Sequence, residues 1–151
     1  MYGNIRWLYL PDEPHVEGDE NGHGTCVTSK VVGPTFGVAK SANIVVVKVA
    51  PIAGRIHVSR VIAAWGAVAG DITSENLRGR AVVINAMGGE QSRSNIVNPE
   101  LTSNPVRPNQ MSENDRTTYI EGIRDVIGLD AVVVAASGNN NVSPYFLRPG
   151  C

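Results

Sequence analysis

Three short runs of aliphatic side chains stand out along the chain, each without the alternation of apolar and polar residues that marks a half-exposed strand. They span residues 42–49, 81–86 and 131–136 and consist mainly of valine, isoleucine and alanine. Uninterrupted aliphatic runs of this length are typical of strands buried on both faces of a parallel sheet. The pattern therefore predicts three buried strands.

Beside these runs, apolar residues recur with the period of an α-helix. The first such segment is 58–69, where one face carries Val58, Val61, Ile62, Trp65, Val68 and Ala69. The second is 117–127, with Asp115 near its start and Gly128 where a C-terminal cap takes a positive φ. A shorter helix is predicted over 25–32.

The order of these elements alternates helix and strand, which predicts an α/β domain with a mostly parallel sheet and helices on both faces. Residues 91–116 include three prolines and few aliphatic side chains, so we expect a surface insertion there. We treat 1–151 as one domain. In such sheets ligands bind beyond the carboxyl ends of the strands, which directs attention to the residues after Ala86 and after Ala136.

Composition and charge exclude several classes of function. Of the 151 residues 42% are hydrophobic and 18% charged, enough to bury a core, and the formal net charge is -1 without clusters of one sign. A nucleic-acid partner and a polybasic membrane contact are therefore not expected. The longest apolar run, 131–136, is far shorter than the ~20 residues that cross a bilayer, and residues 1–10 do not resemble a signal peptide. The cellular compartment stays open.

The most distinctive local feature is a histidine between two glycines, in Asn21-Gly22-His23-Gly24-Thr25. Glycines without Cβ atoms let a substrate or a second catalytic group approach the imidazole. Histidine titrates near neutral pH, which suits general acid–base chemistry. An ordinary loop histidine remains an equal alternative from these residues alone.

Other chemistries are less well supported. The acidic loop around His23 offers potential metal ligands, but their spacing fits no common zinc pattern and a solvated loop is the better interpretation; the residues are His15, Glu17, Asp19, Glu20 and His23. Residues 33–41 imitate a phosphate-binding loop with the wrong spacing. The sequence indicates no metal and no cofactor.

Two further side chains have a structural and a functional interpretation. Cys26 follows His23 by three residues and would be either a reactive thiol or a small buried helix residue, of which we favour burial. Together with Cys151 it does not make a disulfide framework. For His57, at the start of a predicted helix, we expect a capping or surface role.

Three blocks, in order, resemble the subtilisin-like serine proteases. Gly22-His23-Gly24-Thr25, followed by 37–39 and the strand 43–49, is similar to the histidine block of that family. Residues 82–89 resemble the strand that lines the substrate cleft, and 132–139 resemble the strand that ends in the oxyanion asparagine. Cys26 after the His-Gly-Thr triplet is similar to the proteinase K and fungal branches.

The resemblance implies a three-layer α/β fold and a role for each matching residue. His23 would be the general base, and Asn139 would donate its side-chain amide to the oxyanion. Ala86, Met87 and Gly88 would pair by backbone with an extended peptide or protein substrate, although the family usually has serine where Ala86 stands.

Two parts of the family pattern are not matched. The family's catalytic aspartate ends a strand in an Asp-Thr/Ser-Gly setting, which neither Asp12 nor Asp19 has, and no Gly-Thr-Ser block for the nucleophile occurs. We therefore expect an incomplete serine endopeptidase domain that is nearly inactive alone. The alternative is a non-catalytic, peptide-binding remnant of the family. We also expect self-association through exposed sheet edges.

Overall fold

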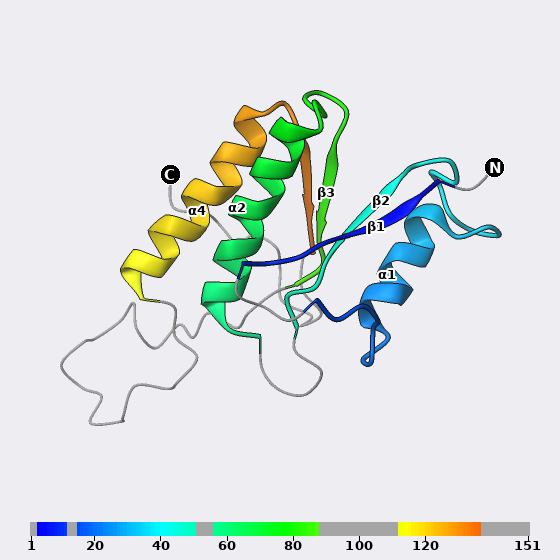
Figure 1. Ribbon diagram of the computed structural model, residues 1–151, viewed down its shortest axis with the longest axis horizontal. Coiled ribbons are helices and arrows are strands. Elements are labelled where there is room, and N and C mark those ends of the chain that lie inside the picture. Colours follow the sequence, from blue (N-terminus) through cyan, green and yellow to red (C-terminus); the bar gives the residue numbers. More distant parts are fainter. Residues whose placement is uncertain (1–2, 12–14, 51–55, 88–111, 137–151) are drawn as a thin grey trace, which may run out of the picture.

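The computed structural model of the chain describes residues 3–11, 15–50, 56–87 and 112–136 (Figure 1). Strands and helices alternate along it, in the order β1 (Ile5–Leu8), α1 (His23–Val32), β2 (Ile44–Val47), α2 (Val58–Ser74), β3 (Val82–Asn85), α4 (Glu113–Gly128) and β4 (Val132–Ala135). The predicted α/β class is therefore confirmed.

The strands form two parallel pairs. β1 pairs with β2 from Ile5↔Ile44 to Leu8↔Val47, and β3 pairs with β4 from Val82↔Val132 to Asn85↔Ala135. All three predicted strands are present, shortened to four residues each. In the described residues the expected single sheet is thus two two-stranded sheets.

Strand β1 was not predicted from the sequence. It holds four residues, one of which is charged, so its apolar pattern is too short to recognise. The charged residue, Arg6, has a structural purpose: its Nη2 donates to Asp71 Oδ2 at 2.6 Å. This ion pair joins β1 to α2.

The helices lie where they were predicted, with different ends. α1 begins at His23 rather than Thr25 and α2 extends to Ser74. α4 begins at Glu113, because Ser112 Oγ accepts the Asp115 N–H at 3.0 Å and caps it. The last four residues of the expected insertion are therefore helical. None of the described helices combines the length and the apolar character needed to span a membrane.

The predicted C-terminal cap of α4 is wrong. Gly128 belongs to the helix, and the positive φ, 59°, falls on Asp130 instead. The helix ends one residue beyond the predicted segment 117–127. The tight turn into β4 follows at Leu129 and Asp130.

The core lies between the helix pair α2 and α4 and one face of the β3–β4 sheet (Figure 1). Trp65 is 4% exposed and Val126 fully buried. Trp65 meets Tyr119 edge-on, with ring centroids 6.2 Å apart. The two helices approach closely because position 122 is glycine: a Cβ there would lie 2.8 Å from Trp65 Cβ.

Among the described residues, no helix or strand covers the opposite face of the β3–β4 sheet. Residues alternate along each strand, so Val83 and Val133 face the core while their neighbours point away. We call these neighbours the outer valine–isoleucine face; they are Val82, Ile84, Val132 and Val134, between 41% and 62% exposed. The expectation that β3 and β4 are buried on both faces is therefore wrong for this structure, because α2 and α4 cover one face. In Figure 1, α1 lies beside β1 and β2, at the opposite end of the molecule from α4.

Candidate active site

His23 is the first residue of α1, at the end of the connection from β1. Because β1 and β2 are parallel and Leu8 pairs with Val47, both strands end at the same edge. Lys48, directly after β2, binds Glu20 of the connection. The segment that leads into His23 is thereby held at the carboxyl edge of a parallel pair, where ligand sites of α/β proteins form.

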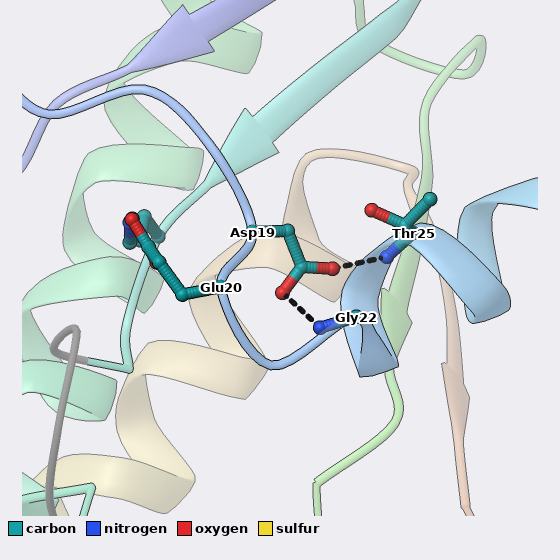
Figure 2. Close-up of polar contacts among 5 residues, drawn as sticks. Asp19, Glu20, Gly22 and Thr25 are labelled. Carbon is teal, nitrogen blue, oxygen red and sulfur yellow. Dashed lines mark hydrogen bonds and ion pairs between the residues drawn. The ribbon is translucent and has the colours of Figure 1, made fainter.

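Asp19 holds the start of α1. Its Oδ1 accepts the Gly22 N–H at 2.9 Å, and its Oδ2 accepts the Thr25 N–H at 2.6 Å (Figure 2). The first amides of a helix have no acceptor within the helix, and here the carboxylate supplies one. These hydrogen bonds, the one from Thr25 above all, hold the pKa of Asp19 below its usual range.

Gly22 is the N-cap residue of α1 and has a φ of 80°. This left-handed backbone favours glycine and costs an ordinary residue energy. Gly22 therefore has a conformational role in addition to any access that the missing Cβ gives to the imidazole.

Two other contacts restrain the acidic loop. Glu20 Oε2 accepts from Lys48 Nζ at 2.8 Å, and this hydrogen bond lowers the pKa of Glu20. Tyr9 donates its hydroxyl to Glu17 Oε1 at 2.8 Å, which raises the pKa of Tyr9, and its ring stacks on His15. The loop's carboxylates are thus engaged with protein groups. Within the described ranges, no three histidine, cysteine, aspartate or glutamate side chains gather as a metal site would require.

The second part of the site lies at the end of β3. Asn85 is 7% exposed, and its Nδ2 donates to the Tyr119 hydroxyl at 3.1 Å. Its Oδ1 accepts the Met87 N–H at 3.2 Å. This side chain therefore fixes the backbone of Ala86 and Met87, both half-buried, to helix α4. Gly88 and Asn139 lie outside the described residues, so their roles remain predictions.

The structure decides the predicted positions of Cys26 and His57. Cys26 is exposed, not buried, because α1 contributes no buried residue to the described core. His57 is exposed at the N-cap of α2; its carbonyl accepts from Arg60 and Val61, while its side chain makes no capping bond. Of the two roles predicted for His57, capping and surface, the structure shows the surface position and no side-chain cap.

Asp19 and Asn85 were not recognised as site residues from the sequence. The signal for Asp19 was its position three residues before a glycine at a helix start, a spacing at which a carboxylate reaches free helix amides. The signal for Asn85 was a polar residue at the end of an aliphatic run.

Comparison with known proteins identifies the family of the chain. The model of the Subtilase family, peptidase family S8, matches residues 4–148. Alkaline protease 1 of Aspergillus flavus is 32% identical over 142 residues, which cover 90% of this chain and 33% of that protease. Subtilisin-like protease 3 is 38% identical over 94 residues in Trichophyton tonsurans and 39% over 93 residues in Arthroderma benhamiae, about 62% and 61% of this chain.

The chain spans a third or less of the length of these fungal relatives: 33% of the alkaline protease and 23% of each subtilisin-like protease. The family match, by contrast, extends over almost all of the chain, from the residue before β1 to beyond β4. The chain belongs to the subtilase family of serine proteases.

Proposed function

We propose that this chain carries the general base, the oxyanion donor and part of the substrate-binding edge of a serine endopeptidase. One observation carries the proposal: His23 opens a helix whose start is fixed by Asp19, next to the carboxyl ends of parallel strands, in a chain that matches the subtilase family. An imidazole at a defined position beside a substrate edge suits general base catalysis.

In the proposed reaction, His23 takes the proton of the attacking serine hydroxyl and later gives it to the leaving amine. Asn139 donates its side-chain amide to the oxygen on which negative charge develops. The backbone of Ala86, Met87 and Gly88 pairs with an extended peptide, as in the addition of a strand to a sheet. The Asn85 side chain supports this last step, because it holds the Met87 amide in place.

The 151 residues contain no Gly-Thr-Ser block. We therefore assign the nucleophilic serine and the catalytic aspartate to parts of the protease that this sequence does not include. The 151-residue chain alone is expected to be nearly inactive, because removal of the nucleophile from a catalytic triad costs about 10⁶ in turnover and leaves only weak residual catalysis.

The test compares the isolated chain with the product of its gene in the native source, whose intact mass is measured first. Both are incubated with a fluorogenic peptide library and with a fluorophosphonate probe that labels activated serines. We expect a native product heavier than 16.1 kDa that hydrolyses peptides and takes the label, and an isolated chain that does neither.

Two outcomes would contradict the proposal. Labelling and hydrolysis by the 151-residue chain would show that it is complete in function. A native product that binds peptides without hydrolysis or labelling would favour the alternative, a non-catalytic member of the family that retains the peptide-binding edge.

We also propose that the isolated chain self-associates. In the described part of the chain each sheet has two strands, so neither edge is paired with a further strand, and the outer valine–isoleucine face adds exposed apolar surface beside β3 and β4. Sedimentation velocity should show dimers or larger species that Val132→Lys reduces. Phe36→Lys, at a side chain that is 81% exposed and lies outside the strands, is the control and should change nothing. A wild-type chain that sediments as a monomer would refute this.

A further inference from the structure

A single carboxylate fixes the backbone on both sides of His23. Asp19 binds the amide of Gly22, the residue before His23, and the amide of Thr25, two residues after it (Figure 2). The peptide groups that end at Gly22 and at Thr25, on either side of His23, are thus held by one carboxylate. The backbone between these two bonds carries His23, so Asp19 restrains the direction in which the imidazole leaves the helix.

No side chain at the N-cap position does this instead. That position is Gly22, which has no side chain, and the first turn of α1 holds no acidic residue. Asp19 therefore supplies, from three residues earlier, the acceptor that an N-cap side chain usually supplies.

The connection that carries Asp19 is itself anchored. Its next residue, Glu20, is paired with Lys48 at the end of β2, and Glu17 is bonded to Tyr9 after β1. Asp19 therefore connects the helix start to a loop that is fixed to the ends of β1 and β2. A loop without these contacts could move together with the helix, and Asp19 would then not fix the helix start relative to the strands.

We propose that Asp19 is a positioning residue for the general base His23. It does not touch the substrate; it holds the helix start so that the imidazole reaches the serine hydroxyl in a reactive geometry. The kinetic consequence rests on the proposed function of this site. A displacement of about 1 Å at a catalytic group can cost about 10²-fold in rate.

The kinetic test uses the native protease with Asp19→Ala, Asp19→Asn and Glu20→Gln. For Asp19→Ala we expect kcat to fall about 10- to 100-fold with little change in KM, because substrate contacts are not altered. Asp19→Asn keeps one acceptor oxygen but places a donor against the other amide, so it should recover only part of the loss.

Glu20→Gln is the matched control. It removes the same charge one residue away, but the amide oxygen of glutamine can still accept from Lys48 Nζ, so both the anchor of the loop and the two amide bonds of Asp19 are kept. We expect kcat within about threefold of wild type, since removing an exposed ion pair has a small effect. An equal loss of kcat in Glu20→Gln and Asp19→Ala would overturn the proposal, because the charge of the loop rather than the capping bonds would then matter.

A second readout does not depend on hydrolysis. With ¹⁵N-labelled glycine and threonine, the amide protons of Gly22 and Thr25 should shift together as Asp19 is protonated. The pKa of Asp19 is lowered, so these bonds persist below the usual carboxylate range and are lost as the pH falls through the lowered pKa. Other titratable side chains near Asp19 are those of Glu20, whose pKa is also lowered, Lys48 and His23, so Glu20→Gln is titrated in parallel.

The outcomes separate the two claims. A native product that is not a protease overturns the proposed function and, with it, the catalytic role of Asp19. A working protease in which Asp19→Ala keeps its kcat overturns the positioning role alone. Amide protons of Gly22 and Thr25 that do not titrate together, or that still do so in Asp19→Asn, would show that the carboxylate does not hold the helix start.

Discussion

Replacement of Trp65 by alanine is expected to lower the free energy of unfolding by about 3–5 kcal/mol. Trp65 is 4% exposed and belongs to the cluster of buried side chains between α2, α4 and the β3–β4 sheet. Truncation removes its edge-on contact with Tyr119 and leaves a cavity that Gly122, with no side chain, does not fill. Since small domains are stabilised by only about 5–15 kcal/mol, this is a large fraction of the total.

Urea denaturation followed by circular dichroism, at a concentration where the chain is monomeric, measures this loss. Trp65→Phe is the informative partner. It keeps an aromatic ring in the cluster and removes the indole N–H, which is buried and has no acceptor among the described residues. It should therefore cost clearly less than Trp65→Ala. Equal losses in the two variants would mean that the cluster needs the full size of the indole and that a smaller aromatic ring does not pack there.

A control on the same helix is Gly66→Ala. Gly66 is exposed, and a Cβ built on it meets nothing within 4 Å. Alanine is a better helix former than glycine by up to about 1 kcal/mol, so this variant should be slightly more stable than wild type. A loss at Gly66 would show that α2 is distorted by any change and that the Trp65 result does not report on the core.

Helices α2 and α4 were predictable from the sequence because the information is local. The apolar residues that face the core recur with a helical period within one segment, and the structure buries that same stripe. The three aliphatic strands were predictable for the same reason. Strand β1 was not, because a four-residue strand is recognisable only through its pairing with β2, 39 residues later at Ile5↔Ile44.

Burial was less predictable than secondary structure. The aliphatic composition of β3 and β4 indicates strands covered on both faces, but which face is covered depends on where helices from other segments pack. Cys26 illustrates the same limit. A small residue in a helix is usually buried, whereas here α1 adds no buried side chain to the described core, so the thiol is exposed.

Within the candidate site, His23 could be singled out from the sequence, but the side chains that hold the backbone of the site, Asp19 and Asn85, could not. His23 is recognisable because its flanking glycines are unusual. Asp19 acts through its oxygen atoms on backbone amides, and a hydrogen bond to a backbone leaves no mark on the sequence of its partner. Asn85 is similar, since it binds the Met87 amide and a hydroxyl on a helix 34 residues away.

The largest effect on activity is expected for His23→Ala in the native protease. In subtilisin, a member of this family, loss of the histidine of the triad lowers kcat by about 2 × 10⁶-fold, and that known loss sets the size expected here. The physical reason is that no other group can take the proton of the serine hydroxyl as the bond to the substrate carbonyl forms. KM should change little, because the proposed function assigns substrate binding to the backbone of residues 86–88 and not to His23.

The chain provides its own matched controls, because it contains three histidines. His57 is exposed at the start of α2 and its side chain makes no capping bond, and His15 stacks on Tyr9 at the surface. His57→Ala and His15→Ala should each leave kcat within about twofold, as surface substitutions usually do. If all three variants lose activity alike, the loss reflects folding and His23 is not the base. If only His23→Ala does, while its fluorophosphonate labelling also falls, the proton acceptor of the serine is this residue, since the probe reacts only with a serine whose proton has been taken.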